Sequence, residues 1–218
     1  MPKIVNHEER REFIARVSAE IIAEQGLEQA TIREIAQRTG FSKGVIEHYF
    51  EDKDHIIDMA LEWIGKRYLQ RERRAVGEKK GLAALKTRLL CSWPLTKESQ
   101  QEWRIRLRFW SIAVVQKEAH PILGKLMLLT RERLIQNIDE AKALGEVPAS
   151  IDTIRTTSML IHISTGLSCN VLVAPMFYNK RYIRETVDNI IADLRSPNVH
   201  LMSLITPNDE SEIEEESV

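Results

Sequence analysis

A segment near the N-terminus, TIREIAQRTGFSKGVIEHYFEDKD at positions 31–54, constrains the fold more than any other part of the sequence. Thr31 and Glu34 have the spacing of a capping box, in which the hydroxyl accepts an early backbone N–H and the glutamate reaches back to the cap. Gly40 then ends the first helix in the left-handed conformation that is easiest without a Cβ atom. Ser42 caps the next helix. The pattern therefore predicts two short helices joined by a glycine turn.

The two helices are too short to be stable alone and must be held by packing. Ala36, Gly40 and Ile46 have the spacing of a helix-turn-helix, with a small residue where the helices touch and an apolar anchor on the second helix. Helical hairpins without a ligand also contain such glycines, so the spacing alone leaves both interpretations open. The residues expected to complete the small core are Ile32, Ile35, Phe41, Val45 and Phe50.

Residues around the second helix favour DNA binding. Lys43 and Gly44 give its N-terminal end a positive charge and no bulky side chain, so this end can approach a phosphate or a base edge closely. His48 and Tyr49 offer hydrogen-bond donors on the solvent side. Lys53 lies in the first turn of the following helix, beside unpaired backbone N–H groups, where it can hold a further phosphate.

The whole sequence predicts an all-α protein of about nine helices. Glycine and proline are few, at 9 and 7 residues, and apolar residues recur at helical spacing. We expect an N-terminal three-helix helix-turn-helix DNA-binding module over 1–55, joined to a C-terminal helical ligand-binding and dimerisation domain over 56–196. An acidic, flexible tail is expected over 197–218. The expected helices span 7–25, 32–38, a short stretch after Ser42, 52–76, 82–93, 98–117, 121–144, 151–174 and 180–195.

Charge and cysteine usage exclude several classes of protein. The formal net charge of −1 does not support binding of nucleic acid by bulk charge, even though six acidic residues gather in 206–218. Cys91 and Cys169 have neither zinc nor disulfide spacing, and we expect no metal and no cofactor.

The stretch 158–177 is long enough for a membrane span but carries polar residues. A buried helix of a cytoplasmic protein, with no membrane partner, is the expectation.

The ordered motif resembles the DNA-binding signature of the tetracycline-repressor (TetR) family. The opening MPKIVNHEERR and the segment RLRFWSIAVVQKEAHPILGKL are also similar to the subfamily of choline–betaine gene repressors. The resemblance is strongest over 8–65 and weaker over 100–135. The positions that match the signature are Thr31, Ile35, Ala36, Gly40, Phe41, Ser42, Gly44, Tyr49, Phe50, Lys53 and Ile56.

The resemblance implies that the second helix of the motif enters the major groove of a double-stranded DNA operator. Glu47 departs from the family, which often has an aromatic residue there. A carboxylate cannot hold a phosphate, but it can accept a hydrogen bond from a cytosine amine. The residues expected to face the groove are Lys43, Gly44, Val45 and His48, those expected to hold phosphates are Thr31, Tyr49 and Lys53, and Arg33, Ser42 and Glu47 complete the predicted DNA-binding set.

The resemblance also implies a ligand sensor whose last two helices form a homodimer as a four-helix bundle. Stripes of small and apolar residues in 151–174 and 180–195 are compatible with this pairing, although such stripes also form ordinary cores. The small-molecule effector is not identified, and no residues of a choline-type aromatic cage can be assigned. Trp110 and His162 are also consistent with plain core positions. The residues expected to line a pocket are Trp93, Trp103, Phe109, Trp110, Met127, Met159, His162 and Asn170.

Three functions are compatible with such a chain. The first is a dimeric repressor that a small-molecule effector releases from a palindromic operator. The alternative is a helical-bundle protein that binds a small molecule or is an enzyme, but no nucleophile–base pair or phosphate-binding loop is visible, so no enzymatic activity is expected. An architectural DNA binder without sequence preference is disfavoured by the weak overall charge.

Overall fold

The computed structural model describes residues 7–50, 52–116 and 121–196, and these ranges contain no strand. They hold nine α-helices and one short 3₁₀ helix, which confirms the all-α prediction. The predicted tail, 197–218, lies outside the described residues. The predicted helix bounds agree with the structure to within about two residues. The elements are α1 His7–Gln25, η1 Leu27–Gln29, α2 Ile32–Thr39, α3 Lys43–Glu47, α4 Lys53–Val76, α5 Gly81–Ser92, α6 Lys97–Gln116, α7 Pro121–Ala143, α8 Thr153–Val173 and α9 Lys180–Arg195.

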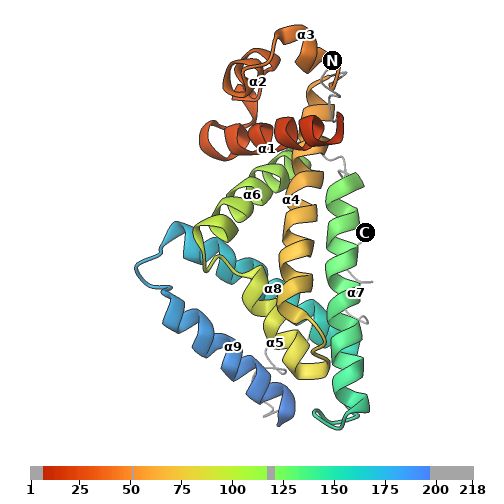
Figure 1. Cartoon of the computed structure of the whole chain (residues 1–218). Coiled ribbons are helices and arrows are strands. Elements are labelled where there is room, and N and C mark those ends of the chain that lie inside the picture. Colours follow the sequence, from red (N-terminus) through yellow and green to blue (C-terminus); the bar gives the residue numbers. More distant parts are fainter. Residues whose placement is uncertain (1–6, 51, 117–120, 197–218) are drawn as a thin grey trace, which may run out of the picture.

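The helices α1, α2 and α3 form a small module at one end of the molecule (Figure 1). The Thr31 hydroxyl caps α2 by accepting the N–H of Glu34 at 3.2 Å, and α2 ends at Gly40, which has a φ of 73°. The Ser42 hydroxyl caps α3 by accepting the N–H of Val45 at 3.4 Å. Caps and glycine turn therefore fix α3 against α2, as the sequence predicted.

One half of the predicted capping box is wrong. The Glu34 carboxylate accepts a hydrogen bond from Arg38 Nε at 3.1 Å instead of reaching back to Thr31. The Thr31 N–H already donates to the carbonyl of Gln29 at 2.8 Å, so it has no proton left for the glutamate. Arg38 also donates to Glu24 at 2.7 Å, which ties α2 to α1.

Two hydrophobic cores hold the described part of the chain. The first joins α1, α2 and α3 to the first half of α4, with Ile46 and Ile56 among its buried residues. It also contains Ile105 and Phe109 from α6. The second core lies among α5, α7, α8 and α9 and includes Trp93, which is fully buried. Because α4 and α6 both contribute to the first core, these two helices connect the module to the larger body.

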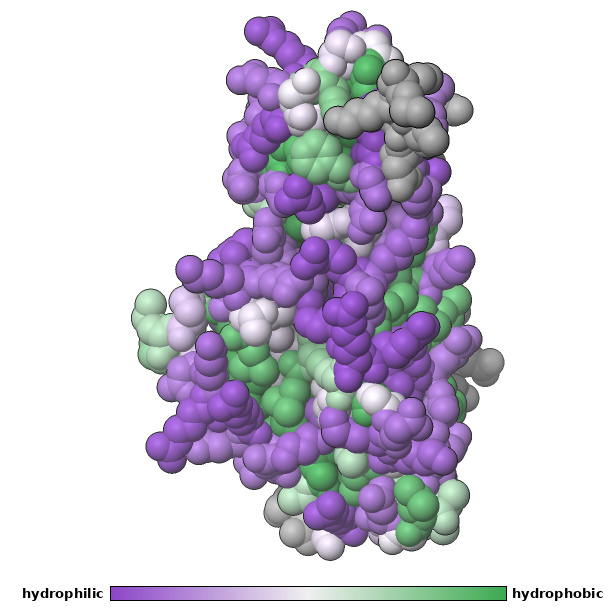
Figure 2. Space-filling model, in the orientation of Figure 1, coloured by the Kyte–Doolittle hydropathy of each residue, from purple (hydrophilic) through white to green (hydrophobic). Residues whose placement is uncertain are grey.

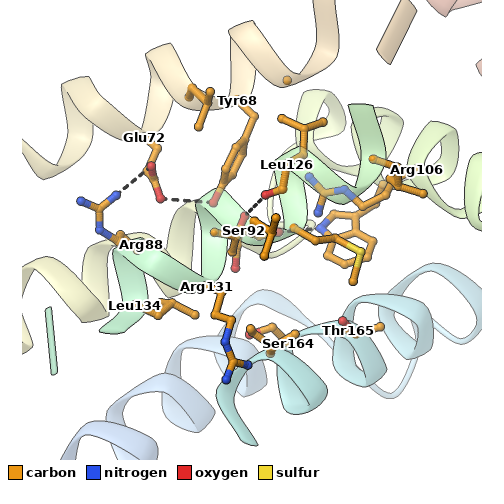
Figure 3. A pocket seen from close by; sticks show the side chains of 18 of the residues that line it. Tyr68, Glu72, Arg88, Ser92, Arg106, Leu126, Arg131, Leu134, Ser164 and Thr165 are labelled. Atoms are coloured by element: carbon orange, nitrogen blue, oxygen red, sulfur yellow. Dashed lines mark hydrogen bonds and ion pairs between the residues drawn. The ribbon is translucent and has the colours of Figure 1, made fainter. Parts of the chain in front are cut away.

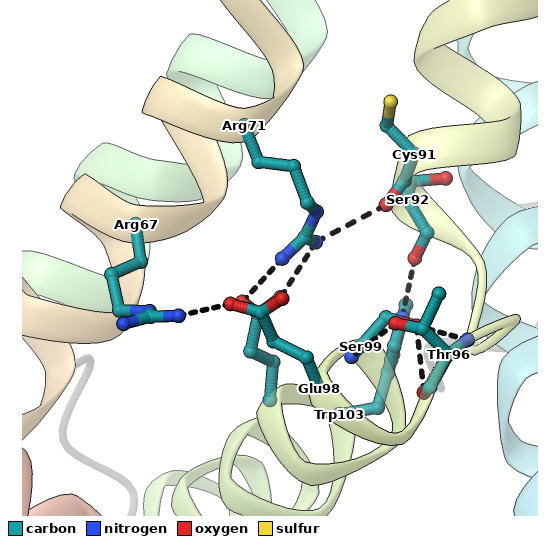
Figure 4. A network of polar contacts seen from close by, with 9 residues as sticks. Arg67, Arg71, Cys91, Ser92, Thr96, Glu98, Ser99 and Trp103 are labelled. Atoms are coloured by element: carbon teal, nitrogen blue, oxygen red, sulfur yellow. Dashed lines mark hydrogen bonds and ion pairs between the residues drawn. The ribbon is translucent and has the colours of Figure 1, made fainter. Parts of the chain in front are cut away.

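The start of α6 is fixed by a reciprocal cap (Figure 4). Ser99 donates its N–H to the Thr96 hydroxyl at 3.1 Å, and Thr96 donates its N–H to the Ser99 hydroxyl at 2.9 Å. One turn further on, Trp103 Nε1 donates to the carbonyl of Ser92 at 2.5 Å, which attaches α6 to the end of α5. These hydrogen bonds fix the start of α6 relative to the end of α5.

Helix α8 is long and apolar enough to cross a membrane by length and composition, and 33% of its most apolar window is buried. The buried share is smaller than the sequence-based expectation of a buried helix. One face of α8, which includes Leu160 and Leu167, packs into the second core, whereas Ile154 and Val173 are exposed. Apolar residues near both ends of α8 are thus left uncovered.

Candidate nucleic-acid interface and ligand cavity

Helix α3 turns one apolar residue into the module and the rest of its surface outward. Ile46 is fully buried in the first core. Lys43, Gly44, Glu47 and His48 are all exposed. In Figure 1, α3 lies at the end of the molecule that is far from the body. The residues expected to face a DNA groove are therefore accessible from outside the subunit.

The two charges of α3 are paired along the helix. Lys43 Nζ lies 3.1 Å from Glu47 Oε1, and the two side chains are 71% and 47% exposed. An exposed pair of this kind contributes only about 0.3–0.5 kcal/mol, so a phosphate or base can displace it. Until then Glu47 reduces the positive charge that α3 offers to DNA.

The aromatic residues that follow α3 hold each other in place. The Tyr49 hydroxyl lies 3.3 Å from His7 Nδ1, at the start of α1. The rings of Tyr49 and His48 meet edge to face at 5.5 Å between centroids. Tyr49 is half-buried in the module, and its ring packs against that of the exposed His48.

The remaining predicted DNA-binding residues lie near the same surface. Thr31, Arg33 and Ser42 are exposed, and the two hydroxyls among them cap α2 and α3. Val45 is half-buried. Lys53 begins α4, but its side chain lies outside the described part of the structure. Direct contact of these residues with DNA stays a prediction.

A cavity of about 740 Å³ lies in the body, among α4, α5, α6, α7 and α8 (Figure 3). Sites for drug-sized ligands have volumes of about 300–1,000 Å³, so this cavity can hold one. Four of the residues predicted to line a pocket do line it. They are Trp103, Trp110, Met127 and His162.

The other four predicted residues are placed elsewhere. Trp93 is in the second core and Phe109 in the first, while Met159 is buried and Asn170 is exposed, and none of them lines this cavity. Phe109 directly precedes Trp110 in α6, but consecutive residues of a helix point about 100° apart. Aromatic content thus identified α6 correctly without identifying its cavity-facing side.

Glu72 is the carboxylate among the lining residues, and it is fully engaged (Figure 3). Its Oε2 lies 2.8 Å from Arg88 Nη1 and 2.5 Å from Arg133 Nη1. Its Oε1 accepts a hydrogen bond from the Tyr68 hydroxyl at 3.3 Å. Burial, and then the negative charge of Glu72, raises the pKa of Tyr68 well above its ordinary value of 10.0, so the phenol keeps its proton.

Arg106 enters the cavity from α6 and is held by ring faces. Its guanidinium carbon lies 4.5 Å from the ring centroid of Trp103 and 5.7 Å from that of Tyr68. Trp110 completes the group, with its ring edge to face against Trp103 at 6.0 Å between centroids. Burial lowers the pKa of Arg106, against the opposing effects of Tyr68 and Glu102.

Three further residues, Tyr68, Arg106 and Arg131, line the cavity but were not predicted from the sequence. For Arg106 a signal was present, because it lies three residues after Trp103 and four before Trp110, the spacing of one helix face. Tyr68 and Arg131 lie on two other helices, and only the packing of those helices brings them to the cavity.

An exposed helix-turn-helix on a helical body defines the chain as a helix-turn-helix transcriptional regulator. Comparison with protein families agrees with this class. Residues 14–60 match the model of bacterial regulatory proteins of the tetR family, and residues 82–196 match that of the BetI-type transcriptional repressor C-terminal domain. The chain belongs to the TetR family of transcriptional regulators and has a BetI-type C-terminal domain.

Curated relatives are similar over most of the chain. The HTH-type transcriptional regulator PksA of Bacillus subtilis is 26% identical over 188 residues, which cover 86% of this chain and 90% of that protein. The HTH-type transcriptional regulator BetI of Burkholderia cenocepacia is 29% identical over 153 residues, covering 68% of this chain and 77% of that protein.

Solved structures share the fold. A putative TetR-family transcriptional regulator from Rhodococcus sp. superposes with a TM-score of 0.75 at 22% identity, covering 87% of this chain and 100% of that one. A putative transcriptional regulator from Saccharomonospora viridis, solved in complex with choline, has a TM-score of 0.74 at 19% identity, covering 85% of this chain and 96% of that one.

Proposed function

We propose that the protein is a cytoplasmic, dimeric repressor that binds a palindromic operator and is released by a small-molecule effector. The observation that carries the proposal is that α4 and α6 both line the cavity and both pack in the core of the DNA-binding module. We divide the chain accordingly into a DNA-binding domain over 1–55 and a regulatory domain over 56–196.

Recognition of DNA would use the surface of α3 and its flanks. The exposed Lys43, Gly44 and His48 can approach base edges, while exposed hydroxyls at the helix caps are suited to phosphates. Since the net charge of the chain is −1, affinity must come from a few placed contacts. Two subunits related by a two-fold axis would place two recognition helices about 34–36 Å apart on successive turns of the major groove.

Dimerisation is supported by exposed apolar residues at α8 and the connection to α9. Val173 is 83% exposed and Phe177 is 71% exposed, with Met176 beside them and Ile154 at the other end of α8. Figure 2 shows apolar side chains in separate patches on one face of the molecule, between stretches of hydrophilic side chains. Large exposed apolar patches mark interaction sites, and a second copy of α8 and α9 would complete the four-helix bundle.

Release by an effector would be transmitted by the two connecting helices. A ligand in the cavity contacts the middle of α4 and of α6, and a shift of either helix moves the module to which it is packed. The spacing of the two recognition helices would then no longer fit the operator. A preference of about 1–3 kcal/mol for the non-DNA state weakens operator binding by a factor of about 5–150.

The alternative is a helical-bundle protein that binds a small molecule without regulating genes, or that is an enzyme. The cavity is the observation in its favour. In the described residues, no group of three or more histidine, cysteine, aspartate or glutamate side chains could hold a metal ion. DNA binding decides between the two functions, because the alternative has no use for the exposed surface of α3.

The proposal is tested by footprinting on the DNA upstream of the gene, since such regulators often control neighbouring genes. We expect a protected inverted repeat, and affinity should fall sharply when one half-site is scrambled. Uniform binding to scrambled DNA, or none to any upstream fragment, contradicts the proposal. A thermal-shift screen of small metabolites, followed by footprinting with each one that binds, tests release.

Dimerisation is tested separately by sedimentation velocity. Val173→Glu and Phe177→Glu should each give monomers and lose operator binding. Val114→Glu, at another exposed apolar residue, is the control and should stay dimeric. A wild-type protein that is monomeric at micromolar concentration overturns this part of the proposal.

A further inference from the structure

We propose that the effector is an anionic amphipathic small molecule, whose carboxylate or similar head group pairs with Arg106 and whose apolar part lies against α4 and α7. The inference rests on the proposed function, since it names the chemical class of ligand for the cavity described above.

Arg106 is a cation inside the cavity with no counter-charge bound to it. Among the residues that the structure describes, no hydrogen bond or ion pair reaches its guanidinium, which is held only by the ring faces of Trp103 and Tyr68. An arginine removed from water is stabilised by a carboxylate or phosphate, to which it can donate two parallel hydrogen bonds. Arg106 is half-buried, and burial lowers its pKa, as expected for a charge that has lost part of its solvation.

Further donors lie around the same space. Trp110 Nε1 is buried and has no hydrogen-bond partner in the described structure, although buried donors are nearly always paired. Arg131 lines the cavity from α7 and donates to the neutral hydroxyl of Ser158 at 3.2 Å. Two arginines and an unpaired indole N–H therefore offer hydrogen-bond donors to a ligand with acceptor oxygens.

The carboxylates near the cavity are already neutralised by other arginines. Glu72 is bound by Arg88 and Arg133 and also accepts a hydrogen bond from the Tyr68 hydroxyl. Glu102 accepts two hydrogen bonds from Arg71, at 2.6 and 2.8 Å. Among the described residues, neither carboxylate forms a hydrogen bond or an ion pair with Arg106, and the charge of Glu102 acts on it only from a distance.

The aromatic residues of the cavity do not form a free cage for a quaternary ammonium ion. Such ions bind over the faces of aromatic rings. Here Arg106 itself occupies that position on Trp103 and Tyr68. Choline, which is bound in the Saccharomonospora viridis structure, would have to displace this cation and would then lie beside it. Repulsion between the two charges opposes that arrangement.

The rest of the cavity suits an apolar chain or ring system. Apolar residues line it from two helices: Leu61 and Ile64 on α4, and Leu123, Leu126 and Met127 on α7. Gly65 allows the two helices to approach there, because a Cβ atom at this position would lie 2.8 Å from Leu126 Cδ2. A head group at Arg106 thus continues into an apolar region between α4 and α7.

The charge preference is tested with three probes that share one apolar chain: octanoate, octan-1-ol and octyltrimethylammonium. Their dissociation constants for the purified full-length protein are measured by isothermal titration calorimetry, with thermal shift as a second readout. We expect octanoate to bind at least about tenfold more tightly than octan-1-ol, and octyltrimethylammonium to bind most weakly.

Variants of Arg106 connect this preference to the residue. Arg106→Met should weaken octanoate binding by about tenfold or more and change octan-1-ol binding by less than about twofold. Arg104→Met, at an exposed arginine of the same helix, is the matched control and should leave all three constants unchanged. Arg106→Lys keeps the charge and should retain the preference for octanoate, which keeps the test valid if Arg106→Met does not fold.

Three results overturn the inference: equal or tighter binding of octyltrimethylammonium, unchanged octanoate binding in a folded Arg106→Met, or no binding of any probe to folded wild-type protein. Footprinting distinguishes these failures from failure of the proposed function. If the upstream inverted repeat is protected while the probes fail, only the ligand class is wrong. If no specific DNA site exists, the repressor function is wrong, whichever probe binds.

Discussion

The guanidinium of Arg71 binds the carboxylate of Glu102 through two hydrogen bonds, of 2.6 and 2.8 Å. The residues are 31 positions apart and join α4 to α6. Arg71 also donates to the carbonyl of Cys91 at 3.4 Å, which adds the end of α5. The two helices that connect the module to the body are therefore fastened to each other beside the cavity.

Replacing Arg71 by methionine should lower the free energy of unfolding by about 2–4 kcal/mol, because Glu102, only 6% exposed, would keep a buried charge without a partner. Urea denaturation measures the loss. The control is Glu98→Gln, which removes the neighbouring Arg67–Glu98 pair, where both side chains are 44% exposed, and should cost at most about 1 kcal/mol. Equal losses in the two variants would show that the Arg71–Glu102 bridge has no special role.

Tyr68 should make stability decrease in alkaline solution. Burial, and then Glu72, raises its pKa in the folded state above the ordinary 10.0. The folded chain therefore holds this proton more tightly than the unfolded chain. The stability that this raised pKa provides is fully present below pH 10. It decreases by about 1.4 kcal/mol per pH unit as the pH rises above 10. Unfolding titrations of wild type and Tyr68→Phe at several alkaline pH values measure the difference in slope, which should vanish if Tyr68 ionises normally.

The two glycines of the helix-turn-helix should respond oppositely to alanine. Gly40 has a φ of 73° and no atom within 4 Å of an added Cβ, so Gly40→Ala should cost about 1 kcal/mol through backbone strain alone. Gly44 is helical and equally open, so Gly44→Ala should stabilise the fold by up to about 1 kcal/mol. It should nevertheless weaken operator binding, because the methyl group faces DNA. Thermal unfolding and gel-shift titration measure both effects, and unchanged operator affinity in Gly44→Ala would contradict the proposed docking of α3.

Removing the carboxylate of Glu47 should strengthen binding to DNA of any sequence. Glu47→Gln frees Lys43 from its 3.1 Å ion pair and leaves the lysine available for a phosphate. The dependence of log affinity on log salt should then steepen by about one unit. Glu185→Gln breaks the comparable exposed pair with Arg181 on α9 and serves as the control. If Glu47 instead accepts a hydrogen bond from a cytosine amine, Glu47→Gln will lose affinity for the operator alone.

Features that depend on neighbours in the chain could be predicted from the sequence. The bounds of α1 and α9 were predicted to the residue, and the cap at Thr31, the turn at Gly40 and the cap at Ser42 were also correct. Each of these features is set by backbone hydrogen bonds within one or two turns. The same holds for the motif that identifies the family, because its spacing is a property of one continuous segment.

Tertiary structure decided which side chains meet. Phe109 and Trp110 are consecutive, yet one joins the core of the module and the other lines the cavity. Glu34 pairs with Arg38 because the backbone N–H of Thr31 is already bonded. The sequence therefore determined the helices, the module and the class of regulator. The placement of Arg106 against Tyr68, and with it the charge of the cavity, depends on the packing of α4 on α6, which local spacing does not encode.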